Sequence, residues 1–530
     1  MLFTSYEFLG FLLLLFFLYY IIPARHQWKL LLAAGYVFYA VSGWKNCLFI
    51  LLTTGSTYIL ALRIDRIHRE QAAYLKEHKK ELSKEEKKSY KARNRSRQWR
   101  LLLTGLFMNF GILAVLKYTN FAIANVNALL SLTGSERQIG FVSFLLPLGI
   151  SFYTFITMGY LIDVYRGKYP AETNPGKLAL FVSFFPQLIQ GPINRFDEMT
   201  ETLFSEHRWN WQEISLGLER ILWGFFKKLV IADRILVGVT TIVGDPETYD
   251  GIYVFVGMMF YALQLYADFT GGIDITVGIA QVLGIRVREN FIRPYFSKNI
   301  AEYWRRWHIS LGAWFTEYIF YPVSVCQPML KFSRFCKKHL GDHVGRRMPV
   351  YMASLAVWFT TGIWHGASWN FVVWGLLNGL IIILSQECEP LYDRFHRKFH
   401  VKDRFWYRLF QVVRTVLLMS SLRMLDCYRN VPLTFRMFGD MLIHSRLSQL
   451  FDGRLMSVGL TVSDYGVLAA GTVILTAVSL AGRKGSVRQQ LAAGPAVVRC
   501  VLIYGLFLCT LIIGAYGVGY DSSQFIYNQF

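Results

Sequence analysis

The stretch MPVYMASLAVWFTTGIWHGASWNFVVWGLLNGLIIILSQ, residues 348–386, contains no aspartate, glutamate, lysine or arginine. Its apolar runs near 348–363 and 369–385 are each close to the roughly 17–25 residues that carry a helix across a bilayer core. Between the two runs lies His365, the only side chain of the stretch that titrates near neutrality. The pattern predicts two membrane helices that meet at a histidine.

The rest of the chain has the same character. Apolar residues make up 54% of the 530 and charged residues 17%, whereas soluble chains carry about 25% charged residues. Further apolar runs occur along the whole sequence: 8–22, 30–41, 49–62, 101–116, 141–162, 251–267, 408–420, 460–480 and 499–518. Mixed segments such as 178–195 separate them, and such segments lie at membrane depth only where protein or a water-filled cavity covers them. We therefore expect an all-α polytopic membrane protein with about eleven spans, plus re-entrant and interfacial helices around an enclosed space.

The net charge of +21 concerns membrane topology. Residues 63–100 hold fourteen lysines or arginines and six acidic residues, and the positive-inside rule places this exposed, helical segment in the cytoplasm. Basic loops also meet anionic lipid headgroups, and no nucleic-acid-binding signature accompanies them. We expect membrane lipids as partners and no nucleic acid.

His365 is a candidate functional residue. A charged group inside a membrane segment costs about 2–3 kcal/mol or more, so an ionisable side chain there suggests function. Burial lowers a histidine pKa and leaves the imidazole neutral and able to accept a proton. Gly362 and Gly366 carry no bulk, which predicts room for a substrate. A core histidine bonded to a neighbouring carbonyl explains the same pattern equally well.

A second histidine, His308, lies in NIAEYWRRWHISL, residues 299–311, which we predict to be one amphipathic helix. Five residues recur at helical spacing on one face: Trp304, Trp307, His308, Leu311 and Phe315. Arg305 and Arg306 point away from that face. An interfacial helix with snorkelling arginines has the same pattern.

Two groups of charged residues suggest binding. Six basic residues are suited to holding the phosphates of a donor, and equally to a positive-inside loop: Arg286, Arg288, Arg293, Lys298, Arg305 and Arg306. Asp268 and Asp274 are suited to binding a coupling ion or proton in a transporter, or to bonding with nearby backbone or arginines. The seven cysteines show no metal-ligand spacing, so we expect no metal site.

The sequence YWRRWHISL at 303–311 and the sequence TGIWHGASW at 361–369 closely resemble the two signature blocks of the membrane-bound O-acyltransferase family. Three further stretches resemble the branch that acetylates alginate in bacteria: LPLGISF at 146–152 with YLIDVYRG at 160–167, FPQLIQGP at 185–192, and YALQLYADFTGGID at 261–274 with ENFIRPY at 289–295. The resemblance covers about residues 1–430. Thr316 departs from it, since the family has an arginine there, and this leaves donor and acceptor open.

The resemblance implies a membrane bundle with a central tunnel, in which an acyl group passes from a cytoplasmic thioester to a hydroxyl. It implies that His365 is the catalytic general base and that His308, also catalytic, orients the donor or stabilises the oxyanion. We expect seven further residues to bind substrate: Arg305, Arg306, Trp304, Trp307, Trp364, Asn370 and Arg293.

The same resemblance implies acetyl-CoA as the donor substrate, with no bound cofactor, and an extracytoplasmic acyltransferase partner that places the acetyl group on a polysaccharide. D-alanyl transfer to teichoic acid from a carrier protein is one alternative, and a transporter using Asp268 and Asp274 is another. We expect the protein to be located in the bacterial plasma membrane. We also expect four regions along the chain: N-terminal transmembrane helices (1–62), a basic cytoplasmic loop (63–100), the catalytic core (101–430) and a C-terminal transmembrane region (431–530).

Overall fold

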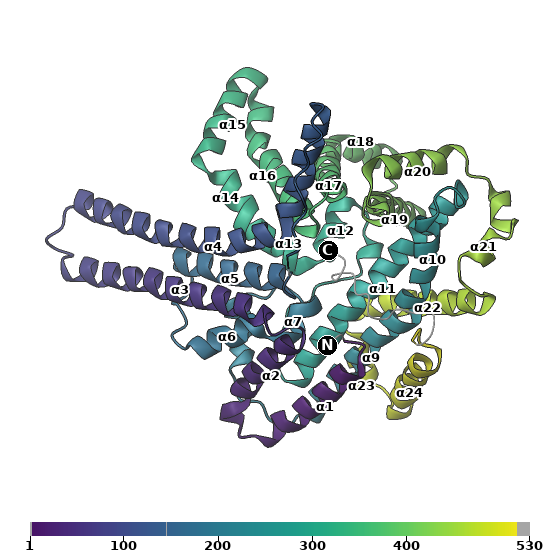
Figure 1. Ribbon diagram of the computed structural model, residues 1–530, viewed down its shortest axis with the longest axis horizontal. Helices are drawn as coiled ribbons and strands as arrows, with labels where there is room; N and C mark the ends of the chain where they lie inside the picture. Colours follow the sequence, from purple (N-terminus) through teal and green to yellow (C-terminus); the bar gives the residue numbers. More distant parts are fainter. Residues whose placement is uncertain (1–2, 145, 517–530) are drawn as a thin grey trace. The chain divides into compact units, whose positions relative to one another are not determined.

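The computed structural model describes residues 3–144 and 146–516, in which the regular elements are helices joined by loops (Figure 1). Over these residues the only β-type contact is an isolated bridge between Phe291 and Trp307. The prediction of an all-α protein is confirmed. The chain forms two compact units: the first runs to Ile214 and includes Ala280–Val287, and the second comprises Ser215–Ile279 and the part from Arg288 onward.

Six of the described helices are long and apolar enough to cross a membrane. They are α3 (Asn46–Glu77), α4 (Lys84–Leu132), α11 (Ile252–Val282), α17 (Trp369–Glu387), α22 (Val462–Ala481) with the short turn after it, and α24 (Ala496–Ile513). The helix α1 (Tyr6–Ile21) is apolar but shorter. The expectation of several spans is confirmed, while the number eleven stays a prediction.

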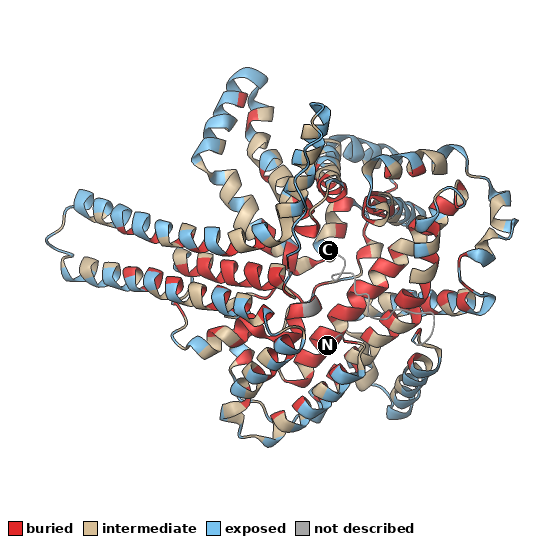
Figure 2. Cartoon of the chain, viewed as in Figure 1, coloured by how far each residue is buried: buried red, intermediate tan, exposed pale blue. Residues whose placement is uncertain are grey.

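The first unit contains two long helices, α3 and α4, that run side by side (Figure 1). Its other helices are α1, α2 (Gln27–Val41), α5 (Ile150–Arg166), α6 (Pro175–Ser183), α7 (Phe185–Gln190) and α8 (Phe196–Leu203). Residues 63–100 form the far ends of α3 and α4, and these ends are largely exposed (Figure 2). The helix α4 begins at a capping box, in which the Ser83 hydroxyl accepts a hydrogen bond from the Glu86 N–H at 3.2 Å. The charged helical segment predicted there is confirmed, and it continues into the spans.

The second unit holds both candidate histidines. Its helices are most of α9 (Trp211–Phe225) and of α11, then α10 (Asp233–Gly244), α12 (Ile300–Arg306), α13 (Ile309–Phe315), α14 (Tyr321–Val325), α15 (Gln327–Leu340), α16 (Asp342–His365), α17, α18 (Glu389–Phe399), α19 (Phe405–Tyr428), α20 (Val431–Ile443), α21 (Arg454–Ser457), α22, α23 (Val487–Ala492) and α24. Wider π-helical turns occur at Phe226–Ala232 and Thr316–Phe320. The helices α16 and α17 lie side by side over much of their length.

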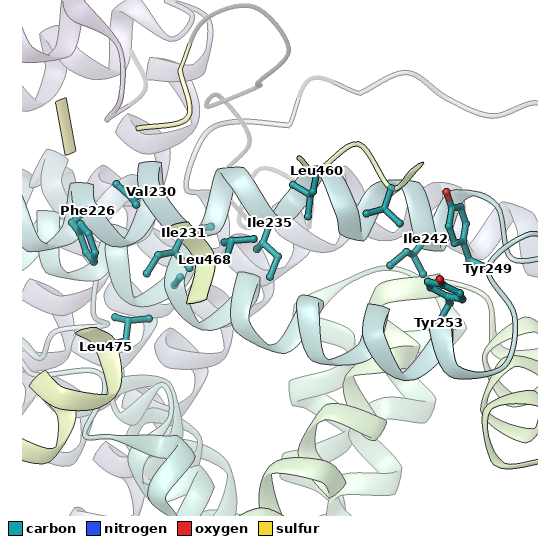
Figure 3. Close-up of a cluster of buried hydrophobic side chains, with 13 residues drawn as sticks. Phe226, Val230, Ile231, Ile235, Ile242, Tyr249, Tyr253, Leu460, Leu468 and Leu475 are labelled. Atoms are coloured by element: carbon teal, nitrogen blue, oxygen red, sulfur yellow. The ribbon is translucent and has the colours of Figure 1, made fainter. Parts of the chain in front are cut away.

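Apolar side chains from the π-helical turn, α10, α11 and α22 form one buried cluster in this unit (Figure 3). A Cβ atom on Gly471 would lie 2.9 Å from Ile231, so α22 approaches the π-helical turn closely. Apolar helices gain little in a membrane by leaving the lipid, and close packing of this kind stabilises their association.

Charged side chains also join the C-terminal helices to this unit. Arg234 pairs with Asp464 at the start of α22 and donates to the carbonyl of Ile513 at 2.5 Å. Arg499 of α24 pairs with Glu219 of α9 at 2.5 Å. Residues 462–513, which lie beyond the resemblance described above, are therefore an integral part of the second unit.

Candidate active site

The backbone breaks sharply at His308. The helix α12 ends at Arg306, and His308 has φ 49° and ψ 53°, in the left-handed region that non-glycine residues seldom adopt. The helix α13 then begins at Ile309. The prediction of one continuous helix over residues 299–311 is therefore wrong.

A distant segment causes the break. The N–H of Ile292 donates to the carbonyl of Arg306, and the N–H of Ile309 donates to the carbonyl of Asn290, both at 3.0 Å. These two bonds take backbone groups that a continuous helix would have used for its own ladder. His308 is consequently the residue that precedes α13, and its position depends on the bonds that Asn290 and Ile292 make to the residues beside it.

The His308 ring is enclosed by aromatic side chains. Its side chain is 3% exposed, and its ring lies edge-on to Phe269 at 5.0 Å and to Trp364 at 6.0 Å between centroids. His308 lies outside the six candidate spans. Burial, together with the positive charge of Arg423, lowers the pKa of His308 to about 3. The imidazole is therefore neutral at physiological pH.

His365 is the last residue of α16 and is 7% exposed. Its ring lies 5.0 Å from Trp374 and 5.0 Å from Trp364, edge-on in both cases. Trp364 therefore contacts both histidines, one from the end of α16 and the other from the turn between α12 and α13. The structure brings the two predicted catalytic residues against a single indole.

The glycines beside His365 serve helix packing. A Cβ atom on Gly362 would lie 2.4 Å from the carbonyl oxygen of Phe371, and one on Gly366 would lie 2.2 Å from the Phe371 ring. The prediction that these glycines leave room for a substrate is wrong, because the first turn of α17 fills the space. Their effect is to bring α17, and with it Trp374, close to His365.

A buried arginine, Arg423, makes cation–π contacts with three tryptophan rings. Arg423 of α19 is 5% exposed, and its guanidinium lies 4.6 Å from the Trp374 ring centroid, 5.6 Å from Trp307 and 5.7 Å from Trp304. Arg423 also pairs with Asp426 at 3.3 Å. Cation–π contacts of this kind strengthen when they are shielded from water. The predicted substrate-binding residues Trp304 and Trp307 thus form one cluster with Trp374.

Trp304 and Asn370 both connect helices. The Nε1–H of Trp304 donates to Asn378 of α17 at 3.1 Å. Asn370 donates to the carbonyl of Leu425 in α19 at 3.1 Å and accepts from the hydroxyl of Ser368 at 2.5 Å. The Trp304 bond joins α12 to α17, and the bond from Asn370 to Leu425 holds the start of α17 against α19. A role of Asn370 in orienting His365 stays a prediction.

The predicted basic residues have different surroundings. Arg305 is exposed, and Arg306 pairs with Glu302 at 2.5 Å. Arg293 has φ 47°. Burial and the charges of Arg306 and Arg483 lower the pKa of Arg293, which indicates that these positive groups act on one another. Grouped positive charges of this kind attract an anion.

The carboxylates considered for transport are paired with basic side chains. Asp268 lies 2.7 Å from the Lys228 ammonium, and Lys228 also contacts Asp233 at 2.6 Å. Asp274 contacts Lys227 at 2.5 Å and Arg220 at 2.8 Å. These pairings favour the structural interpretation of Asp268 and Asp274 over ion coupling.

Sequence reasoning missed three residues of the site: Asn290, Trp374 and Arg423. Asn290 belongs to a stretch that was noted only for its resemblance. Arg423 follows an apolar run directly, and an arginine so close to apolar sequence is itself a signal for function. Trp374 carries no signal of this kind, since tryptophan is ordinary in a membrane helix.

Comparison with known proteins places both histidines within a family domain. Residues 170–425 match the family model described as MBOAT, membrane-bound O-acyltransferase family. The chain is 35% identical over 392 residues to the probable alginate O-acetylase AlgI of Azotobacter vinelandii, covering 73% of this chain and 69% of that protein. It is 32% identical over 325 residues to the peptidoglycan O-acetyltransferase of Helicobacter pylori, covering 56% of this chain and 57% of that protein.

The likeness extends to a third activity. The chain is 26% identical over 278 residues to the teichoic acid D-alanyltransferase of Bacillus subtilis, covering 51% of this chain and 65% of that protein. The family domain, the sequence identity to relatives and the apolar helices all indicate a membrane-bound acyltransferase. This chain is a multi-pass membrane acyltransferase that belongs to the membrane-bound O-acyltransferase family.

Proposed function

We propose that this protein moves an acetyl group from cytoplasmic acetyl-CoA across the membrane, for O-acetylation of an extracellular or periplasmic polysaccharide. The observation that carries the proposal is the pair of buried histidines, His308 and His365, whose rings lie 6.0 Å and 5.0 Å from the Trp364 ring within the family domain. The relatives named for alginate and peptidoglycan acetylation support a polysaccharide as acceptor and acetyl as the group transferred.

His365 is proposed as the general base. It takes the proton of the attacking hydroxyl while the hydroxyl oxygen bonds to the thioester carbonyl carbon, a contribution of roughly 10²–10⁴-fold. The carbon–sulfur bond then breaks, and the sulfur leaves with the electron pair and recovers the proton from His365 as a thiol. Trp364 and Trp374 keep water away from the thioester. His308 either orients the donor or stabilises the oxyanion.

The basic residues are proposed to hold the donor. Arg293 and Arg306 act on one another electrostatically, and Arg305 is exposed nearby in the chain. Guanidinium groups bind phosphate oxygens in pairs of hydrogen bonds, which suits the phosphates of CoA. Trp304 and Trp307 would then form the apolar wall along which the acyl end of the donor enters. An extracytoplasmic acyltransferase partner would receive the acetyl group, with the protein in a bacterial plasma membrane.

The test is release of free CoA from acetyl-CoA by the purified protein in nanodiscs, with alginate oligomers or peptidoglycan fragments as acceptors. His365→Ala should lower the rate at least about 100-fold. His343→Ala is the matched control, because His343 is an exposed histidine on the same helix, and it should stay within about twofold. An unchanged rate in a folded His365→Ala variant would contradict the proposed role.

D-alanyl transfer is the second candidate, and the 26% identity to a teichoic acid D-alanyltransferase favours it. A D-alanyl-loaded carrier protein offered in place of acetyl-CoA separates the two donors in the same assay. Consumption of the carrier thioester alone would reassign the donor and leave the acyltransferase mechanism in place.

A further inference from the structure

Asn290 makes four contacts with three residues, His308, Ile309 and Ser310, at the start of α13. The residue is fully buried, and its backbone carbonyl accepts from the Ile309 N–H at 3.0 Å. Its side-chain oxygen lies 3.0 Å from the Ser310 N–H nitrogen, 2.9 Å from the Ser310 hydroxyl and 3.2 Å from Nδ1 of His308. One amide therefore faces both residues that flank Ile309.

The Ser310 backbone settles which end of the Asn290 amide points at His308. A backbone N–H can only donate, so the atom that it contacts must be the amide oxygen. Turning the amide over would set its NH₂ group against the Ser310 N–H. The same oxygen therefore faces Nδ1 of His308, and a hydrogen bond between them requires that Nδ1 carries the proton.

A neutral imidazole with a proton on Nδ1 has its lone pair on Nε2. The lowered pKa of His308, caused by burial and by Arg423, excludes the doubly protonated ring at physiological pH. The left-handed backbone of His308 is strained and persists only where the surroundings enforce it. The bonds from Asn290 to Ile309, Ser310 and His308 supply that constraint.

We propose that Asn290 is the positioning residue of His308, holding its imidazole as the Nδ1–H tautomer so that Nε2 faces the substrate as a hydrogen-bond acceptor. The inference rests on the proposed function and refines it. An acceptor nitrogen orients an N–H, O–H or S–H group of a bound substrate. It does not donate to an oxyanion, so of the two roles proposed for His308 the geometry selects orientation.

The first measurement reads the tautomer and requires no turnover. Solid-state ¹⁵N NMR of histidine-labelled protein in lipid, compared with His308→Gln, isolates the His308 signals. Wild type should show a protonated Nδ1 and an unprotonated Nε2. Asn290→Leu should lose that preference, while Asn290→Asp keeps the acceptor oxygen and should retain it. A protonated Nε2 in wild type would overturn the proposal, whatever the enzyme's substrate.

The second measurement is steady-state CoA release. Asn290→Leu should lower kcat about 10–100-fold, the range found when a metal-binding histidine loses the partner that orients it, with the KM for acetyl-CoA changed by less than about threefold. Asn290→Asp should recover part of kcat. Ser310→Ala removes the hydroxyl bond to the same oxygen but leaves the Ser310 N–H bond and the contact to His308, so its kcat should fall less than that of Asn290→Leu.

The two measurements separate the possible failures. If wild type shows the Nδ1–H tautomer but consumes neither donor, the positioning stands and the proposed function fails. If Asn290→Leu unfolds, its melting temperature reveals this, and Asn290→Asp then carries the test. An Asn290→Leu variant that folds, with wild-type kcat and an unchanged His308 spectrum, would refute the role of Asn290.

Discussion

The contact between α16 and α17 can be tested with a single methyl group. In Gly362→Ala the new Cβ would lie 2.4 Å from the carbonyl oxygen of Phe371 and 3.3 Å from the Cα of Val372. Both are backbone atoms of α17, so no side-chain rotation can relieve the contact. The first turn of α17 must move by roughly 1 Å, because interiors are close-packed and ordinary contacts begin near 3.4 Å.

Overpacking of this kind costs about 1–3 kcal/mol of stability. The larger effect should be on turnover, because His365 ends α16 and Trp374 lies on α17, and a displacement of about 1 Å at a reacting centre costs roughly 10²-fold. CoA release and thermal unfolding of the nanodisc-embedded protein measure the two effects. We expect a large loss of kcat with only a modest drop in melting temperature.

Gly312→Ala is the matched control for that experiment. Gly312 lies in α13, and a Cβ atom there would have nothing within 4 Å. Alanine at such a helical site adds up to about 1 kcal/mol of helix propensity, so stability and rate should be at least preserved. If Gly362→Ala turned over at the Gly312→Ala rate, the position of His365 would not depend on the approach of α17.

Two further predictions concern buried charge. Lys228→Met should lower the free energy of unfolding by about 3–5 kcal/mol, because Asp233 and Asp268 lose the ammonium they share. Arg66→Met, which breaks the exposed ion pair with Glu70, should lower it by at most about 1 kcal/mol. Equal losses for the two variants in denaturant titrations would contradict the importance of the buried pair. The pKa of His308 is lowered from 6.5 to about 3 on folding, so between these values the unfolded chain binds the extra proton, and stability should fall as pH drops from 6.5, by up to about 1.4 kcal/mol per pH unit. His308→Gln should flatten that slope, whereas the exposed His343→Gln should leave it unchanged.

Several features could be predicted from the sequence because they depend on local composition. The uncharged stretch 348–386 predicts two membrane helices that meet at His365. The helices α16 and α17 meet there, but only α17 is among the six described helices that are long and apolar enough to cross a membrane. The basic segment 63–100 predicts exposed helix, and the ends of α3 and α4 are exposed helix. Hydropathy and helical periodicity predict whether a single segment forms a helix and which of its residues are exposed, and these properties depend here on the segment's own composition.

The prediction of one continuous helix through His308 was wrong for a physical reason that lies outside its own segment. The periodicity around Trp304 and Trp307 indicates a continuous helix, and nothing local contradicts it. The bonds that break the helix come from Asn290 and Ile292, which belong to another stretch of the chain. Competition between a helical ladder and a distant backbone partner leaves no trace in local hydropathy.

By itself, then, the sequence determined that this is a helical membrane protein, that it carries the two signature blocks of an acyltransferase family, and that His365 stands between two apolar helices. Only the tertiary structure decided that Trp364 contacts both histidines, that Phe371 fills the space beside Gly362 and that Arg423 lies behind the tryptophans. Single-helix properties follow from hydropathy summed along the chain, whereas these contacts depend on which atoms of separate helices reach one another at van der Waals distance.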